Sequence, residues 1–264
     1  MTTELEKIDG LARLLIEART NRVPLATVPD DLVPADAGAA QLVDDHVAAV
    51  TGWPVLGWKI GCTSEHAQKL LGSSGPFAGR VYSVYEDGAV ITDDDLCTDP
   101  MLEGEFAFTI ADDLTPSAPP TGGRTRAGVM AAVADLRPAI ELVGGRYATF
   151  VGTPLLLLVA DAGANTHLVL GSPVTDPDLE ALDAVGVTME VDGANTGRGR
   201  GADVLGHPID ALMWLVDHLS ARSITLRAGQ VVTTGTATQV SAFPAGATAT
   251  ASFAGLGSVS VGRG

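Results

Sequence analysis

The sequence predicts an α+β fold that is mostly β, with helices at the start of the chain and in its middle. Three observations lead to this prediction. Apolar residues recur near helical period in the N-terminal part, short β-like segments separated by Gly, Pro and Asp turns follow from Val55 onward, and one strong helical segment begins at Pro208. Runs of strands with segregated helices are typical of α+β folds and not of a regularly alternating parallel sheet.

The N-terminal part of the chain is predicted to form two helices. Residues 3–22 carry apolar side chains near helical period and are followed by Pro24. Residues 36–50 form a second helical segment, which is interrupted by a Thr-Gly pair. We therefore expect an N-terminal helical arm, residues 1–54, followed by a main domain, residues 55–264.

The main domain is predicted to contain many short strands, two helices and a surface loop. Helices are expected at residues 126–136 and 208–219, the second with Pro208 at its first position. The Pro- and Gly-rich residues 112–126 are expected to form the loop. The strand segments are VLGWKIG, RVYSVY, GAVI, GEFAFTI, PAIELVG, TPLLLLVA, HLVLGSPV, GVTMEVDG, SITLRAG, QVVTTG and a C-terminal hairpin with Gly255 and Gly257 in its turn.

Composition limits the classes of function. A chain of 264 residues with 46% hydrophobic content is long enough to bury a large core. Its formal net charge of −16 argues against nucleic acid or an anionic membrane as a partner, because both would be repelled. Cys62 and Cys97 are expected to be reduced core residues, and the acidic, polar start of the chain predicts a cytoplasmic protein. A serine hydrolase is not expected, because the G-x-S-x-G elbow is absent.

Three carboxylates stand out from their surroundings. Glu103 and Glu105 lie in the expected strand MLEGEFAFTI, where alternation places both on one face while Phe106 and Phe108 point the other way. The alternative is an amphipathic strand whose polar face meets water. Glu141 lies in an otherwise apolar strand, where a lone ionised carboxylate is costly, and this favours a metal site. Oxygen-only ligands favour Mg²⁺ or Mn²⁺ over zinc.

Two other residues have alternative interpretations. Lys59 in GWKIG either extends outward, as most lysines do, or points into a site where nearby charge tunes it for proton transfer. Asp161, at the end of LLLLVADAGAN, either forms a cap or reaches into a site.

Six motifs occur in an order that resembles the 2-keto-4-pentenoate hydratase group of the fumarylacetoacetate hydrolase superfamily. They are GWKIGCTS, MLEGEFAF, PAIELVGGR, VADAGAN, GRGRGADVLGHPIDALMWL and VVTTGTAT. The resemblance implies the mixed, rolled sheets of that fold and an oligomeric assembly. It also implies that Glu103, Glu105 and Glu141 bind Mg²⁺ or Mn²⁺ and that Lys59 is an acid/base or substrate-orienting group.

The sequence departs from the family pattern after the K-I-G strand. Members of the group commonly carry an acid in a P-D-[FY]-G motif, whereas this chain has Gly75-Pro76-Phe77-Ala78-Gly79-Arg80. Phe77 or Arg80 is expected to reshape the substrate pocket there, for a bulkier or more anionic tail. Asp161 and Thr236 are further candidates for contact with the substrate.

The resemblance implies a lyase that adds water to a 2-hydroxy-2,4-dienoate and gives a 4-hydroxy-2-oxo acid, in the catabolism of aromatic compounds. A decarboxylase of a vinylogous 2-oxo diacid and an acylpyruvate C–C hydrolase are the enzymatic alternatives, because the same enolate serves all three reactions. A silent subunit that stabilises a related decarboxylase or hydratase is the alternative from another class. The expected partners are a small 2-oxo acid, further copies of the chain and such a related enzyme.

Overall fold

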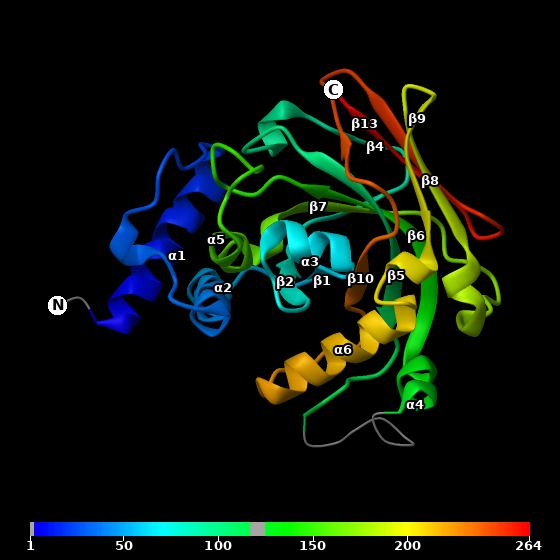
Figure 1. Cartoon of the computed structure of the whole chain (residues 1–264), viewed down its shortest axis with the longest axis horizontal. Coiled ribbons are helices and arrows are strands. Elements are labelled where there is room, and N and C mark those ends of the chain that lie inside the picture. The colour runs from blue at the N-terminus through cyan, green and yellow to red at the C-terminus, as the bar shows by residue number, and fades with distance from the viewer. Residues whose placement is uncertain (1–2, 117–124) are drawn as a thin grey trace.

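The structure is a computed structural model that describes residues 3–116 and 125–264, and its larger sheet lies near the centre of the molecule (Figure 1). The strands of this sheet are β1 (Gly57–Gly61), β2 (Phe77–Val81), β3 (Val84–Glu86), β5 (Met101–Ile110), β6 (Val133–Val143), β7 (Asn165–Leu170), β10 (Val231–Thr236) and β11 (Ser241–Ala242). Their order is β2-β1-β10-β5-β6-β7-β3, with β11 paired to β5. The pairs are antiparallel, apart from the parallel pairs β1 with β10 and β3 with β7.

The smaller sheet contains the C-terminal hairpin. Its strands are β4 (Ala89–Ile91), β8 (Gly186–Val191), β9 (Ala194–Arg200), β12 (Thr248–Phe253) and β13 (Gly257–Arg263), in the order β4-β13-β12-β8-β9. The hairpin of β12 and β13 turns through residues 254–256, and Gly255 has a φ of +76° there. The predicted terminal hairpin is confirmed.

Helices lie beside the larger sheet (Figure 1). The α-helices are α1 (Glu4–Asn21), α2 (Ala37–Thr51), α3 (Glu65–Leu71), α4 (Arg126–Ala131), α5 (Leu155–Ala160) and α6 (Pro208–Ala221). Short 3₁₀ turns are η1 (Asp30–Leu32), η2 (Asp93–Asp95), η3 (Ala162–Ala164), η4 (Leu179–Ala184) and η5 (Gly201–Asp203). In the part of the chain that the structure describes, no helix combines the length and apolar character needed to cross a lipid bilayer.

Local side-chain chemistry explains where the two N-terminal helices begin. Thr3 caps α1 through a reciprocal capping box with Glu6, and the Asp36 carboxylate accepts a hydrogen bond from the Ala39 N–H at the start of α2. Both helices were predicted from their apolar period, and both predictions are confirmed. The predicted helix at Pro208 is confirmed as α6.

Two hydrophobic cores hold the elements together. The larger core lies between the two sheets and beneath α6, and the rings of Phe106 on β5 and Phe253 on β12 meet edge to face within it at 5.1 Å. The second core joins α1 and α2 to α5, with Leu11, Leu15 and Leu157 among its buried members. The N-terminal helices are therefore packed against the main domain through α5.

One predicted strand is a helix. The run TPLLLLVA forms α5, which begins at Leu155, directly after Pro154. Leucine is a strong helix former, and the run has only one β-branched residue after Pro154, so its apolar character reflects burial of a short helix. The prediction of a strand here was wrong because a short apolar run has no period that distinguishes the two structures.

Other predictions about secondary structure need smaller corrections. The helix predicted at residues 126–136 ends at Ala131, because Val133 already pairs with Ile110 in the larger sheet. The segment SITLRAG forms no strand beyond an isolated bridge from Leu226 to Leu114. The helix α3 was not predicted. Most of the loop predicted at residues 112–126 lies outside the described residues.

Candidate active site

The three glutamates meet where β5 pairs with β6. Glu103 lies directly opposite Glu141 in the antiparallel register, and Glu105 lies two residues further along the same face. One carboxylate oxygen from each residue lies within 4.8 Å of the other two. Glu105 and Glu141 are fully buried, while Glu103 is partly exposed. Alternation along β5 places Phe106 in the core on the opposite face, as predicted.

Lys59 points into this cluster from β1. Its Nζ atom lies 3.3 Å from Glu141 Oε2 and donates a hydrogen bond of 3.1 Å to the Gly163 carbonyl oxygen. A side chain at position 163 would be strained, because φ is +65° and a Cβ atom would lie 2.9 Å from Lys59 Cδ. The inward orientation is therefore the one that the structure shows, although an outward lysine is the commoner case.

Burial and mutual repulsion perturb these groups. Burial raises the pKa of Glu105 well above its ordinary value, and the charges of Glu141 and Glu103 add to the effect. Burial also raises the pKa of Glu103, where the positive charge of Lys59 opposes it. For Lys59, burial acts to lower the pKa, but Glu141, Glu103 and Glu105 together outweigh it and the pKa is raised. The cluster thus has more negative charge than its one ammonium group neutralises.

The unsatisfied oxygens of the cluster fit a hard divalent cation. Glu105 Oε2 accepts a hydrogen bond of 2.8 Å from the Gly235 N–H, but the buried Glu105 Oε1 has no hydrogen-bond partner among the described residues. Three converging carboxylates with an orphaned buried oxygen form the type of donor set that Mg²⁺ and Mn²⁺ prefer. The residues present are therefore suited to hold such an ion.

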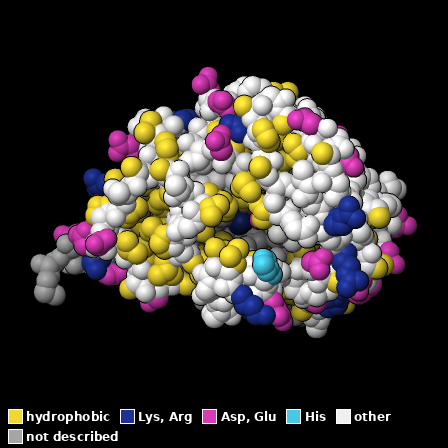
Figure 2. All heavy atoms as spheres, turned by 45° about the horizontal axis from the view of Figure 1, so that its top comes forward, with side chains coloured by type: hydrophobic (Ala, Val, Ile, Leu, Met, Phe, Trp, Pro, Cys, Tyr) yellow, Lys and Arg dark blue, Asp and Glu magenta, His cyan; other side chains and the backbone are white. Residues whose placement is uncertain are grey.

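A cavity of about 530 Å³ opens above Lys59 and Glu103. Its walls are mainly hydrophobic, with Leu70, Leu71, Phe77, Val143, Phe150, Val151, Leu155, Leu158 and Val240 in the lining. Among the described lining residues, Lys59 is the only cation. Figure 2 shows hydrophobic side chains around a hollow near the centre of the face that it displays, with a basic group visible inside.

Two of the residues proposed for substrate contact come from β2. The Phe77 ring lines the cavity, with its centroid 5.6 Å from Lys59 Nζ. Arg80 is instead held by Asp44 and Asp45 on α2 and is not among the residues that line the cavity. Because its charge is already neutralised there, the expectation that Arg80 would shape the pocket for a more anionic tail has no support in this arrangement.

The other two candidates also lie outside the lining of the cavity. Asp161 follows the last residue of α5, where its buried carboxylate pairs with Arg146. Thr236 lies opposite Glu105 in the pairing of β10 with β5, and its hydroxyl donates to the Thr238 carbonyl oxygen at 3.0 Å. Both side chains support the backbone around the site.

Asn165 was missed by the sequence analysis. It is fully buried at the start of β7, and its Nδ2 atom donates a hydrogen bond of 2.8 Å to Glu141 Oε1. This contact orients a carboxylate of the cluster. The signal available in the sequence was a polar amide that follows the VADAGA run directly and precedes another apolar segment.

The structure thus combines mixed sheets with a carboxylate cluster beside an inward lysine, as the resemblance to the fumarylacetoacetate hydrolase superfamily implies. The family model of the fumarylacetoacetate (FAA) hydrolase C-terminal domain matches residues 60–261. The chain belongs to the fumarylacetoacetate hydrolase family. The expected family and fold are thereby confirmed.

Individual relatives narrow the class. The chain is 34% identical to a 2-keto-4-pentenoate hydratase of Paraburkholderia phymatum over 96% of both chains, and 32% identical to a 4-oxalocrotonate decarboxylase of Pseudomonas putida over 98% and 97%. Among solved structures, 4-oxalocrotonate decarboxylase from Pseudomonas putida G7, complexed with magnesium and adipate, matches with a TM-score of 0.85 and 27% identity over 100% and 99% of the chains. The hydratase relatives confirm the expected enzyme class, a lyase of the hydratase type.

Proposed function

We propose that this protein is a divalent-metal-dependent hydratase that converts a 2-hydroxy-2,4-dienoate of the 2-keto-4-pentenoate type into a 4-hydroxy-2-oxo acid in the catabolism of aromatic compounds. The observation that carries the proposal is the convergence of three carboxylates and one lysine at the base of a mainly apolar cavity. The hydratases among the relatives are named for this substrate type.

Glu103, Glu105 and Glu141 would hold Mg²⁺ or Mn²⁺. A bound ion would supply Lewis-acid stabilisation of the negative charge that develops on a 2-oxo acid. The related decarboxylase has been solved with magnesium and with calcium, which supports a divalent ion in general. The choice between Mg²⁺ and Mn²⁺ is part of the proposal.

Lys59 would act on the substrate as an acid/base or carboxylate-orienting group. Its ammonium is held by the Gly163 carbonyl and by Glu141, so that it lies beside the carboxylates on the cavity floor. In the reaction, the 2-hydroxyl loses its proton while a proton is added at the far carbon of the dienoate, which gives an α,β-unsaturated ketone. Water then adds across the double bond, with its hydroxyl group on the β-carbon and a proton on the α-carbon. A positioned acid or base is typically worth about a hundredfold to ten-thousandfold in such steps.

The walls of the cavity favour a neutral substrate tail. Lys59 is the only cation among the described lining residues, and the 2-oxo acid end would lie beside it. A second carboxylate on the tail would meet the buried Val143 and Leu158 and the half-buried Phe77 without a counter-ion, and burying an unpaired charge is costly. We therefore place the hydratase ahead of the decarboxylase of a vinylogous 2-oxo diacid.

The decarboxylase is the second candidate, because a decarboxylase is similar to this chain over its full length in both sequence and structure. The acylpyruvate hydrolase has less support. That reaction needs a base that activates water, and the adjacent Glu65 and His66 are exposed on α3 and are not among the described residues that line the cavity.

Product analysis tests the reaction. The Mg²⁺-loaded protein is supplied separately with freshly generated 2-hydroxypenta-2,4-dienoate, a vinylogous 2-oxo diacid and an acylpyruvate. We expect turnover of the first to a 4-hydroxy-2-oxo acid. Turnover of the second or third alone would refute the hydratase.

Titration with Mn²⁺ tests the metal ligands. We expect Glu105→Gln to weaken Mn²⁺ binding at least roughly tenfold, because it removes one carboxylate ligand. Glu65→Gln is the matched control, since its side chain is 90% exposed on α3 and should leave the affinity unchanged. Equal affinities for the wild type and Glu105→Gln would favour a catalytically silent subunit.

We further propose that the protein works in the cytoplasm as a homo-oligomer, and that a related decarboxylase or hydratase is a candidate partner. Light scattering after size-exclusion chromatography tests the homo-oligomer, and co-purification with the related enzyme tests the complex. A monomer at micromolar concentration would contradict the first proposal.

A further inference from the structure

A second cavity, of about 480 Å³, lies on the other side of Asn165 from the carboxylate cluster. It is bounded by the last turn of α1, the residues before β1, the β2–β3 connection and the start of β7. Three arginines, Arg19, Arg22 and Arg146, contribute to its lining. The chain has only 16 lysines and arginines against 32 acids, so a cavity with three arginines is an unusual concentration of positive charge here.

The guanidinium of Arg146 is hydrogen-bonded within the protein through all three of its nitrogens. Its guanidinium pairs with the Asp161 carboxylate and also donates to the backbone oxygens of Asp161 and Asn165, at 2.8 and 2.6 Å. Each nitrogen of this guanidinium therefore has a protein partner. Arg146 forms the positive wall of the cavity and has no nitrogen left without a partner.

The charge of Arg19 is not neutralised in this way. Among the described residues, its guanidinium makes a single hydrogen bond, a long one of 3.4 Å to the Asn165 carbonyl oxygen, and no carboxylate lies within ion-pair distance. Burial lowers the pKa of Arg19 to about 10, and the repulsion from Arg146 adds to this effect. Arg19 thus stays protonated while it lacks a counter-ion.

The rings around Arg19 hold its guanidinium in place. Its central carbon lies 5.1 Å from the centroid of the Tyr82 ring and 5.9 Å from that of Trp53, and these two rings meet edge to face. The Tyr82 hydroxyl is buried and has no hydrogen-bond partner among the described residues. The residues that line the cavity thus include a guanidinium without an ion pair and a tyrosine whose buried hydroxyl has no partner, and the acid among the described lining residues, Asp95, is engaged by Thr92.

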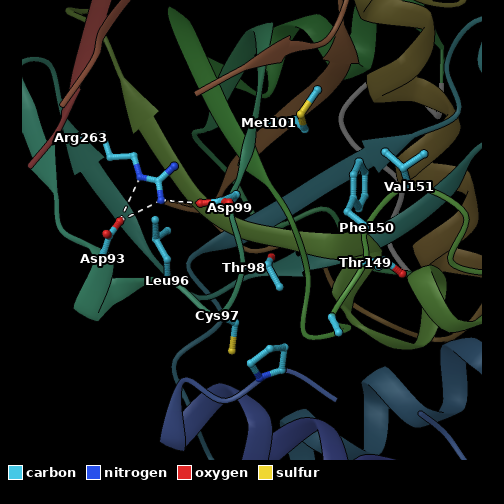
Figure 3. Close-up of a pocket in the computed structure, with 12 residues that line it drawn as sticks. Asp93, Leu96, Cys97, Thr98, Asp99, Met101, Thr149, Phe150, Val151 and Arg263 are labelled. Atoms are coloured by element: carbon cyan, nitrogen blue, oxygen red, sulfur yellow. Dashed lines mark hydrogen bonds and ion pairs between the residues drawn. The ribbon is translucent and has the colours of Figure 1, made fainter. Parts of the chain in front are cut away.

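A neighbouring pocket shows the opposite arrangement. Arg263 there is held by Asp93 and Asp99, with nitrogen–oxygen distances of 2.9 and 2.6 Å (Figure 3). Cys97 lines both pockets, so the two lie next to each other. Arg263 is thus paired with acids in one pocket, while Arg19 has no such pair among the described residues in the other.

We propose that the second cavity is a binding site for a small oxyanion, a carboxylate or a phosphate, which Arg19 holds with the Tyr82 hydroxyl. An anion at this position would give Arg19 the counter-ion that it lacks and would satisfy a buried hydroxyl. The site is next to the carboxylate cluster, because Asn165 accepts from Arg19 through its carbonyl and donates to Glu141 through its amide. The proposal does not depend on the reaction proposed above.

Calorimetric titration of the full-length protein after removal of metal with EDTA tests the site. Sodium benzoate and inorganic phosphate are the two probes, and uncharged benzamide is the negative control. We expect one or both anions to bind with a stoichiometry of one per chain, and benzamide not to bind. Binding of benzoate alone assigns a carboxylate site, binding of phosphate alone a phosphate site, and binding of both an oxyanion site without selectivity.

Variants assign the binding to this cavity. Arg19→Gln should lower the affinity for the anion at least tenfold, and Tyr82→Phe should lower it severalfold. Arg227→Gln, at an arginine with a 69% exposed side chain, should leave the affinity unchanged. Glu105→Gln should also leave it unchanged, which separates this site from the carboxylate cluster. Should Arg19→Gln fail to fold, Arg19→Lys and Tyr82→Phe serve instead.

Three results would overturn the proposal. These are the absence of binding by both anions, equal binding by the wild type and the Arg19 and Tyr82 variants, or loss of binding in Glu105→Gln. The first would be expected if an acidic side chain of a second copy of the chain fills the cavity in the oligomer.

Discussion

Asn165 connects the carboxylate cluster to two arginines that line the second cavity. Its amide orients Glu141 in the carboxylate cluster, and its carbonyl receives hydrogen bonds from Arg19 and Arg146 behind the cluster. Residues that orient ligands in this way typically contribute about tenfold to a hundredfold to metal affinity. The position of Glu141 therefore depends on contacts from outside the cluster.

Substitution of Asn165 should weaken metal binding while the three carboxylates remain. We expect Asn165→Ala to lower the Mn²⁺ affinity by about tenfold to a hundredfold, because Glu141 loses the hydrogen bond that orients it. Asn195→Ala, at an exposed position on β9, is the matched control. Unchanged Mn²⁺ affinity in Asn165→Ala would show that the amide does not position Glu141.

His167 should make the stability of the protein depend on pH. Burial lowers its pKa from 6.5 to about 4, while the Asp95 carbonyl opposes this shift. Between these values the unfolded chain binds a proton that the folded chain does not, so the contribution to stability is present above pH 6.5 and is lost as the pH falls through 4. The difference corresponds to roughly 3 kcal/mol.

Comparison of two proteins isolates this effect. The free energy of unfolding of the wild type minus that of His167→Gln, measured by urea denaturation from pH 7 to pH 4, should decrease as the pH falls. Subtraction removes the contribution of other titrating groups such as Asp44, whose pKa is raised to about 6 by burial. A difference that stays constant with pH would show that His167 is protonated equally in both states.

At the scale of the elements, the site depends on close backbone approach between β2 and η3. Gly79 faces the Ala162 carbonyl, and a Cβ atom at position 79 would lie 2.1 Å from that oxygen. Gly79 also pairs with Lys59 in the register of β1 with β2. The turn that supplies the Gly163 carbonyl to Lys59 is thereby held against the sheet.

A methyl group at this contact should destabilise the fold. We expect Gly79→Ala to lower the free energy of unfolding by about 1–3 kcal/mol or more, because backbone atoms must move apart. Gly186→Ala on β8 is the control, since nothing lies within 4 Å of its Cβ position, and its effect should stay within about 0.5 kcal/mol. Equal stability of the two variants in urea denaturation would contradict the close approach.

At the scale of the whole molecule, the N-terminal helices support one wall of the candidate active site from behind. They share a core with α5, and Leu155 and Leu158 of α5 line the cavity above Lys59. The boundary predicted between residues 54 and 55 separates the two parts of the sequence, but the packing joins them. The division into an arm, residues 1–54, and a main domain, residues 55–264, therefore stays a prediction.

Removal of residues 1–54 should abolish stable folding. Full burial of a large aliphatic side chain is worth about 1.5–3 kcal/mol, and several such side chains would lose their partners, which is comparable to the 5–15 kcal/mol of a typical domain. Circular dichroism melting of the fragment 55–264 checks this expectation. A cooperative transition with retained Mn²⁺ affinity would show that the arm is dispensable.

Within the N-terminal helix, a matched pair of substitutions tests the same packing in the full chain. Leu11→Ala, at a fully buried position, should cost about 2–5 kcal/mol, whereas Leu5→Ala, 68% exposed on the same helix, should have little effect.

The sequence by itself determined the features that depend on neighbouring residues. The alternation along β5 set Glu103 and Glu105 on one face, the caps and apolar period set the N-terminal helices, and the ordered motifs identified the family. These signals are local, because side-chain direction and capping depend on residues only a few positions apart.

The tertiary structure alone decided what meets across the sheet. Strand register set Glu141 opposite Glu103, and parallel pairing with β10 placed Lys59 beside them. The contact between Arg19 at the end of α1 and Asn165 at the start of β7 left the guanidinium without an ion-paired carboxylate among the described residues. The run of leucines in α5 shows the same limit, since its apolar residues fit either a strand or a helix until packing is known. Convergence of distant segments depends on register and packing, which no short stretch of sequence encodes.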